Sequence, residues 1–171
     1  MSSKLDQIKF IIQRYDTYIA GVNTKGTFIV AFNTFFCGVA VSNYDKLKLL
    51  FVPNGNVTAL NIHLLILFVL SVASTFIVGL AVFPYLKSGN SSKEKYHTLI
   101  FFGSVAEYKD ENEYARTFKK MSAEEFEDDA AKQANLLARG VRSKFKLIGI
   151  SMWVFFGQLL TLLSLLIFII K

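Results

Sequence analysis

Residues 147–170 read LIGISMWVFFGQLLTLLSLLIFII, an uncharged run that ends against Lys171. A helix rises about 1.5 Å per residue, so roughly 20 apolar residues cross a hydrocarbon layer of about 30 Å. This run is longer than that requirement. It therefore predicts a transmembrane helix at 147–170 and decides the class of the protein.

Two further runs support the same class. Residues 62–86 are uncharged apart from the titratable His63 near the start, and residues 26–42 carry no charged side chain. The run at 26–42 is shorter, but apolar residues before it extend it by one or two turns. The alternative is a helical hairpin buried in a soluble protein, which two such long runs disfavour. We therefore predict three transmembrane helices.

The composition agrees with a membrane protein. Hydrophobic residues make up 53% of the chain and charged residues 19%, below the roughly 25% that is usual for soluble domains. The apolar and charged residues also gather into separate blocks, whereas a soluble core would interleave them. The polar residues 1–16 lack the apolar core and cleavage site of a signal peptide.

The distribution of Lys and Arg predicts the orientation. Residues 1–25 and 87–146 carry four and twelve of them, whereas residues 43–61 carry two and the C-terminus carries only Lys171. Basic residues accumulate on the cytoplasmic side of membrane proteins. We therefore expect the N-terminus and the 87–146 lobe in the cytoplasm. The external loop at 43–61 and the C-terminus then lie in the periplasm.

The segment 1–25 has the pattern of an amphipathic helix. Its apolar positions alternate spacings of three and four, at Leu5, Ile8, Ile12, Tyr15, Ile19 and Val22. Such a seam is typical of a helix that packs on another helix. Charges of both signs occupy the other faces, which favours packing against the lobe over lying on the membrane surface. We expect this helix to run without a break into the first span.

The external loop contains the turn signal Pro53-Asn54-Gly55-Asn56. Short apolar arms at 49–52 and 57–60 flank this turn, so the pattern predicts a small hairpin. The loop is too short for an active site and is expected to be a connector.

The cytoplasmic lobe is predicted to be helical. Its apolar segment 99–104 is too short to span a membrane, so it must be buried, and residues 110–120 are expected to form a short helix. Ser122-Ala123-Glu124-Glu125 has the form of a capping box. The acidic cluster at 124–129 is interpreted as the solvated start of that helix.

No proline interrupts the chain between this capping box and Lys171. The last helix of the lobe should therefore continue directly into the third span, over about 70 Å. The predicted fold class is thus an all-α membrane protein, with a cytoplasmic helical lobe continuous with the first and last spans.

The sequence contains no recognisable catalytic or metal-binding motif. It contains no Walker motif, no nucleophile elbow and no zinc-protease helix, so we predict no catalytic residues and no enzyme. Cys37 is the single cysteine, and no Cys/His cluster has the spacing of metal ligands, so no metal site is expected. No stripe of aromatic and basic residues indicates nucleic-acid binding.

Two polar residues stand out within the predicted spans. Asn33 lies near the middle of the first span and Gln158 about halfway along the third. Polar groups in hydrocarbon face other helices or water, so the pair either hydrogen-bonds between helices or lines a pore in an oligomer. A small-residue stripe at Gly149, Gly157 and Thr161 suggests close helix contact.

The chain resembles the transmembrane effector family of the Pycsar antiphage system. The similarity is carried by Asn23-Thr24-Lys25 at the first span and Leu99-Ile100-Phe101-Phe102-Gly103 after the second, and it extends over nearly the whole chain. The pattern Gln133…Leu137-Ala138…Lys144-Phe145 before the last span also matches.

The resemblance implies an effector of the bacterial inner membrane. Such effectors sense a cyclic pyrimidine mononucleotide, cyclic CMP or cyclic UMP, which a functionally paired nucleotide cyclase makes during phage infection. They then impair the membrane and stop growth. A homo-oligomer in the lipid bilayer is expected. No cofactor is expected apart from the activating nucleotide.

On this resemblance, candidate ligand-binding residues can be named. A cyclic phosphate requires cationic donors, for which Lys25, Arg139 and Arg142 are candidates, and Asn23 is a further ligand candidate. The base requires an aromatic or apolar slot with an amide partner, for which the candidates are Phe101, Phe102 and Gln133. Each basic residue has the alternative of a solvated or lipid-facing position.

Two other functions stay open at this point. One is a CBASS-type membrane effector gated by a cyclic oligonucleotide, which needs a larger and more basic pocket. The other is a membrane scaffold without enzymatic activity whose lobe binds a protein partner.

Overall fold

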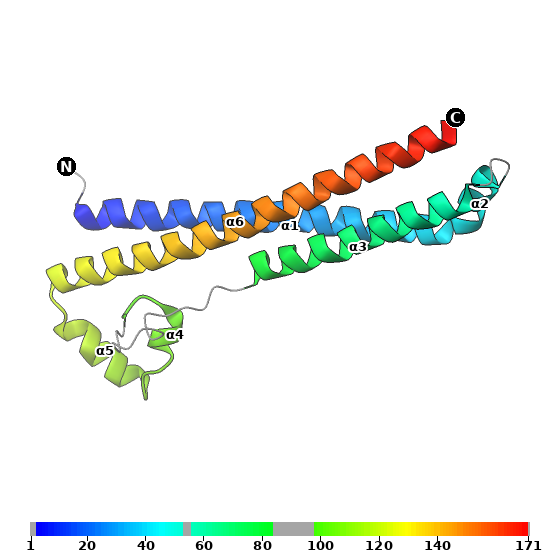
Figure 1. Ribbon diagram of the computed structural model, residues 1–171. Coiled ribbons are helices and arrows are strands. Elements are labelled where there is room, and N and C mark those ends of the chain that lie inside the picture. Colours follow the sequence, from blue (N-terminus) through cyan, green and yellow to red (C-terminus); the bar gives the residue numbers. More distant parts are fainter. Residues whose placement is uncertain (1–2, 53–55, 84–97, 171) are drawn as a thin grey trace. The chain divides into compact units, whose positions relative to one another are not determined.

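The computed structural model describes residues 3–52, 56–83 and 98–170, with side chains up to Ile167. The elements are α1 (Lys4–Ser42), α2 (Tyr44–Phe51), α3 (Val57–Val82), α4 (Phe102–Val105), α5 (Glu111–Lys120) and α6 (Ala123–Ile170) (Figure 1). The residues described contain no strand. The predicted all-α class is confirmed.

Three of these helices, α1, α3 and α6, are long and apolar enough to cross a membrane. The three predicted spans are therefore confirmed as helices. The end of the second predicted span, residues 84–86, lies outside the described residues. Both α1 and α6 run unbroken from a charged segment into an apolar one, which confirms the predicted continuity.

The chain divides into two compact units. Residues 1–20 and 84–143 form the first, which we call the lobe unit. Residues 21–83 and 144–171 form the second, which we call the spanning unit. Because α1 and α6 cross the boundary between these residue sets, each helix contributes to both units.

The spanning unit is a bundle of the later part of α1, all of α3 and the later part of α6 (Figure 1). Its main core contains Val22, Ile29, Val78, Ala81, Ile148 and Phe155. The Phe155 ring meets Phe32 edge-on, with centroids 4.9 Å apart. A second cluster joins Phe51 of α2 to Leu60 of α3 and Leu165 of α6. These contacts tie each long helix of the unit to the other two.

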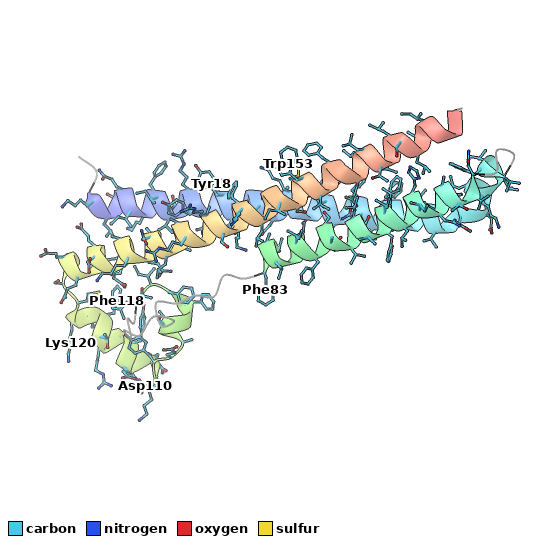
Figure 2. The ribbon with its side chains drawn as sticks, in the orientation of Figure 1. Tyr18, Phe83, Asp110, Phe118, Lys120 and Trp153 are labelled. Carbon is cyan, nitrogen blue, oxygen red and sulfur yellow. The ribbon has the colours of Figure 1, made fainter. Side chains whose placement is uncertain are left out.

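Polarity in the spanning unit is inverted relative to a soluble protein. Its buried polar side chains are Asn33, Ser71, Ser74, Lys144, Ser151 and Gln158. Its exposed apolar side chains include Phe28, Phe35, Phe68, Phe76, Trp153 and Leu160. The indole of Trp153 is 78% exposed and projects outward from α6 in Figure 2. A surface this apolar is stable in lipid, where the interior can satisfy the polar groups.

The prediction of a hairpin in the loop at 43–61 is wrong. Both of its arms are helical, because residues 49–51 belong to α2 and α3 begins at Val57. Phe51 of the first arm and Leu60 of the second are buried in the second cluster. Helical arms are compatible with this packing. The Tyr44 hydroxyl also donates a hydrogen bond to Asn61 Oδ1, at 2.9 Å, and joins α2 to α3. Residues 53–55 of the turn lie outside the described residues.

The lobe unit confirms both predicted helix starts. Asp110 caps α5 by accepting a hydrogen bond from the Glu113 amide at 2.8 Å. The Ser122 hydroxyl accepts from the Glu125 amide at 3.2 Å, and the Glu125 carboxylate accepts from the Ser122 amide at 2.7 Å. This reciprocal pair is the predicted capping box. The Ser122 amide also holds the pKa of the Glu125 carboxyl below its ordinary value.

A row of aromatic rings fixes α5 in the lobe unit. Tyr114 and Phe118 lie one turn apart on α5, with ring centroids 6.2 Å apart. Tyr108 meets Tyr114 at 5.4 Å, and Phe126 of α6 meets Phe118 at 5.8 Å. The last two pairs are edge-to-face, and such pairs add to the stability that burial provides. The short helix α5 is therefore anchored to the start of α6.

Gly26 lets α1 and α3 approach closely. A Cβ atom at this position would lie 2.9 Å from Val78 Cγ1 and 3.1 Å from Val82 Cγ2. We predict that Gly26→Leu lowers the free energy of unfolding by about 1–3 kcal/mol, because overpacking forces the helices apart. Thermal unfolding in detergent micelles measures this loss.

Gly38→Leu is the matched control for Gly26→Leu. No atom lies within 4 Å of a Cβ at Gly38, which is on the same helix. Both variants gain the same helix propensity, so only packing distinguishes them. Equal unfolding temperatures for the two variants would show that the close approach at Gly26 is unimportant.

Candidate functional site

Asp129 organises the segment that follows the second span. Its carboxylate is only 4% exposed and accepts hydrogen bonds from the Thr98 hydroxyl at 3.1 Å and the Leu99 amide at 2.9 Å. The Leu99 carbonyl in turn accepts from the Tyr114 hydroxyl at 3.1 Å. One buried carboxylate therefore fixes the start of the apolar segment against α6, and Tyr114 of α5 bonds to the same residue, Leu99.

Gln133 lies one helical turn after Asp129 on α6 and shares its buried face. It is 6% exposed, and its Oε1 atom has no hydrogen-bond partner among the residues that the structure describes. Buried polar atoms are satisfied in the great majority of cases, so an exception requires an explanation. Gln133 Oε1 is thus a buried acceptor whose hydrogen-bond donor is not among the described residues.

Phe101 and Phe102 follow the segment that Asp129 holds. Their rings lie 4.7 Å apart, with Phe101 half-buried and Phe102 exposed. A Cβ at Gly103 would come within 2.6 Å of Phe101 Cε1, so the absence of a side chain at Gly103 leaves room for this ring. The sequence candidates Phe101, Phe102 and Gln133 thus belong to one unit, and Phe101 is the more enclosed ring.

Arg139 and Arg142 lie on the exposed side of α6. They follow Gln133 by six and nine residues, which is about one and two-thirds and two and a half turns. The structure therefore does not bring either guanidinium onto the buried face that carries Gln133.

Asn23 and Lys25 belong to the spanning unit, not to the lobe unit. Asn23 is half-buried, and its Oδ1 atom has no hydrogen-bond partner within the described ranges. Lys25 is exposed, and its ammonium lies 6.0 Å from the centroid of the Phe145 ring. That geometry is a cation–π contact between α1 and α6.

A cavity of about 320 Å³ in the lobe unit is lined by Ser104, Glu107, Tyr108, Glu113 and Thr117. Burial raises the pKa of the Tyr108 hydroxyl. Two carboxylates in the lining repel an anionic ligand. This cavity is therefore unsuited to a nucleotide phosphate.

The amides of Asn33 and Gln158 meet inside the spanning unit. Gln158 Nε2 donates to Asn33 Oδ1 at 3.1 Å and to Ser71 Oγ at 2.7 Å. Asn33 Nδ2 donates to Thr75 Oγ1 at 3.1 Å and to the Ser71 carbonyl at 3.3 Å. The four side chains form a polar cluster that joins α1, α3 and α6. We call it the amide cluster.

Two smaller contacts extend this polar interior along α3 and α6. The hydroxyls of Ser74 and Ser151 lie 3.1 Å apart, and His63 Nε2 lies 3.1 Å from Ser164 Oγ. Only part of the predicted small-residue stripe lies close to another helix. A Cβ at Gly157 would lie 3.9 Å from Leu70 Cδ1, but no atom lies within 4 Å of a Cβ at Gly149.

Lys144 caps the C-terminal end of α3. The residue is 6% exposed, and its ammonium donates to the carbonyls of Ala81, Val82 and Phe83 at 2.7, 3.2 and 3.0 Å. The last carbonyls of a helix have no partner within the helix, and the helix dipole favours a cation there. A single side chain of α6 therefore satisfies the end of α3.

Sequence reasoning missed the roles of Asp129 and Lys144. Asp129 was interpreted as part of the solvated cluster at 124–129, and this was wrong because its side chain is buried under the segment that begins at Thr98. A signal was present in the spacing. Asp129, Gln133, Leu137, Gly140 and Lys144 recur every three or four residues and continue the buried stripe of α6 into the lobe.

Replacing Asp129 should loosen the segment that it holds. We predict that Asp129→Ala lowers the stability of the lobe unit by about 1–3 kcal/mol, because the Thr98 hydroxyl and the Leu99 amide lose their buried acceptor. Hydrogen exchange at residues 98–101 should become faster. Asp128→Ala is the matched control, because Asp128 is exposed and pairs with Lys132 on the surface of the same helix. Equal exchange in both variants would contradict the role of Asp129.

Replacing Lys144 should release the end of α3. We predict that Lys144→Met destabilises the protein by about 1–3 kcal/mol, because three carbonyls lose a charged donor. Thermal unfolding in micelles measures this, with the exposed Lys146→Met as control. Unchanged unfolding in Lys144→Met would show that the cap contributes nothing.

Comparison with known proteins places the chain in a family. The model of the Pycsar effector protein domain matches residues 7–171, almost the whole chain. No curated protein and no solved structure matches the chain. The match extends over all of α2 to α6 and over α1 apart from its first three residues. The chain therefore belongs to the Pycsar effector family and is a multi-pass membrane effector of antiphage defence.

Proposed function

We propose that the protein binds a cyclic pyrimidine mononucleotide, cyclic CMP or cyclic UMP, through its lobe unit and then impairs the bacterial inner membrane. The observation that carries the proposal is the buried Oε1 atom of Gln133, which has no hydrogen-bond partner among the described residues, in a chain of the Pycsar effector family. The excess of Lys and Arg in 1–25 and 87–146 supports a cytoplasmic lobe.

In this proposal Gln133 reads the edge of the base. A glutamine amide offers one acceptor and two donors, which matches a pyrimidine edge that carries both kinds of group. The exocyclic amino group of cytosine or the N3–H of uracil would donate to Gln133 Oε1. The half-buried Phe101 ring would provide the apolar wall, while Phe102 is too exposed to enclose a base by itself.

The phosphate requires positive charge. Arg139 and Arg142 are exposed on α6. They would attract the phosphate through the positive potential around them and would not contact the nucleotide beside Gln133. Lys25 and Asn23 belong to the spanning unit, and the proposal assigns them no contact with the base. Binding should therefore depend on salt through the arginines and on base identity through Gln133.

The response to binding is proposed to pass along α1 and α6. Each helix contributes residues to the lobe unit and to the spanning unit, so a ligand that favours one packing of the lobe acts on helices that also form the bundle. In a homo-oligomer within the bilayer, such a change would open a path or disrupt lipid packing. A nucleotide cyclase that responds to phage would supply the ligand.

Replacing Gln133 tests the proposal. Purified protein should bind cyclic CMP or cyclic UMP in calorimetry and release dye from liposomes when the nucleotide is added. Gln133→Leu should weaken binding about tenfold to a hundredfold, because the base loses a buried hydrogen bond. Asn135→Leu, at an exposed amide two residues further on, should bind like the wild type.

The same experiment separates the other functions. Binding of a cyclic oligonucleotide, with no response to either mononucleotide, would favour the CBASS-type effector. Recovery of a stable protein partner without any nucleotide response would favour a scaffold. In either case the proposed ligand would be wrong.

A further inference from the structure

Two exposed lysines mark one end of the spanning unit. Lys25 is the last charged residue of α1 before the uncharged run at 26–42, and Lys146 is the last of α6 before the run at 147–170. The Lys25 ammonium lies 6.0 Å from the centroid of the Phe145 ring, and Phe145 precedes Lys146 in the chain. The contact puts both lysines at one level of the bundle, where helices pass from hydrocarbon to the headgroup layer.

The spanning unit offers these lysines no carboxylate at this level. Its only Asp or Glu is Asp45, which follows Lys25 by twenty residues and lies beyond the other end of the uncharged run. Neither Lys25 nor Lys146 has an acidic residue three or four positions away on its own helix, where an ion pair could form. An anion that neutralises the two ammoniums must therefore come from outside this unit.

The exposed face of α6 beyond Lys146 is apolar. Four large exposed side chains continue this face at spacings of three and four residues, which is one row along a helix: Ile150, Trp153, Phe156 and Leu160. We call them the apolar row. Gly149 leaves the same region of α6 uncovered, because no atom lies within 4 Å of a Cβ at this position. A pair of cations followed by an apolar row matches the two parts of a phospholipid, its headgroup and its acyl chains.

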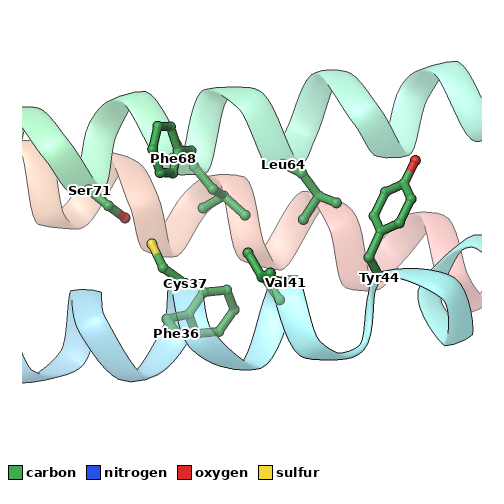
Figure 3. Close-up of a pocket in the computed structure, with 9 residues that line it drawn as sticks. Phe36, Cys37, Val41, Tyr44, Leu64, Phe68 and Ser71 are labelled. Atoms are coloured by element: carbon green, nitrogen blue, oxygen red, sulfur yellow. The ribbon is translucent and has the colours of Figure 1, made fainter.

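A cavity between α1 and α3 provides a contrast. It has a volume of about 320 Å³, and most of its lining is apolar, including Phe36, Val41, Leu64 and Phe68 (Figure 3). None of the described residues that line it is charged. An acyl chain that enters this cavity is therefore selected by shape alone, whereas the two lysines beside α6 can select the headgroup as well.

We propose that the outer face of α6 beside Lys25 and Lys146 binds an anionic phospholipid. The headgroup phosphate accepts hydrogen bonds from both ammoniums, and an acyl chain lies along the apolar row. Basic residues on neighbouring transmembrane helices bind anionic headgroups at the membrane surface. A zwitterionic headgroup gains less, because it carries its own cation beside the phosphate.

The bound lipid joins two helices. Lys25 belongs to α1 and Lys146 to α6, so one phosphate between them holds these helices together at the membrane surface. Without the phosphate the two ammoniums repel each other. This inference goes beyond the proposed function and does not depend on which ligand activates the protein.

The single tryptophan of the chain tests the inference. Trp153 lies in the apolar row, so its fluorescence reports which lipid is beside it. The full-length protein, without nucleotide, is placed in mixed phosphatidylcholine and phosphatidylglycerol vesicles in which one lipid or the other carries quenching bromine atoms on its acyl chains. We expect the anionic phosphatidylglycerol to be preferred at Trp153 on the order of fivefold, and this preference should fall at high salt.

Removing the two lysines should remove the preference. In Lys25→Gln with Lys146→Gln, both lipids should quench Trp153 about equally, because the headgroup loses both ammoniums. Lys46→Gln with Lys48→Gln is the matched control, since it removes the same charge from exposed positions of α2 and should keep the preference. Circular dichroism and the unfolding temperature check that the variants fold.

A second reporter separates this site from a general excess of anionic lipid around a basic protein. Phe68→Trp in a Trp153→Phe background moves the tryptophan to the uncharged cavity of Figure 3. Both brominated lipids should quench it equally.

Three outcomes would overturn the lipid site. Equal quenching of the wild type by both lipids would show that the face of α6 does not select the headgroup. A preference that persists in the double glutamine variant would show that the two lysines do not bind the phosphate. Absence of quenching by either lipid would show that protein, such as a second copy of the chain, covers Trp153.

Discussion

The spanning unit depends on one constraint, which is that hydrocarbon cannot hydrogen-bond to a polar group. The bundle meets it by turning its polar side chains inward. Asn33 and Gln158 bond to each other and to Ser71, so that α1, α3 and α6 converge on a single cluster. Large apolar side chains on the outside are then compatible with lipid. In a membrane the hydrophobic effect does not drive helices together, so these hydrogen bonds and close packing specify the arrangement.

The lobe unit follows a different logic, that of a small soluble domain. Its helices are short, their ends are capped by Asp110 and by the pair of Ser122 and Glu125, and a row of aromatic rings holds α5 on α6. Asp129 adds the buried hydrogen bonds that fix the segment after the second span. A few polar contacts therefore determine how the lobe packs. The helices α1 and α6 each contribute residues to both units.

Much of the fold could be predicted from local patterns. The three apolar runs, the capping box at Ser122 and the unbroken α6 follow from composition, spacing and the absence of proline. The loop was mispredicted because a turn signal with apolar arms suits a hairpin as well as two helix ends that bury Phe51 and Leu60. Asp129 and Lys144 were missed because their roles depend on contacts with residues far away in the sequence. Leu99 is 30 residues from Asp129, and Ala81 at the end of α3 is 63 residues from Lys144. The ligand contacts suggested for Gln133 and the arginines stay predictions.

Lys144 has a consequence for the kind of motion that the bundle allows. Its ammonium bonds to three successive carbonyls where α3 stops, and this sets the depth of α6 beside that helix. Sliding α6 by one turn in either direction would carry the ammonium about 5.4 Å along the axis and break these three bonds. Swinging about the same point would leave the three bonds in place. The three bonds of Lys144 therefore oppose axial sliding of α6 and permit its rotation about this residue.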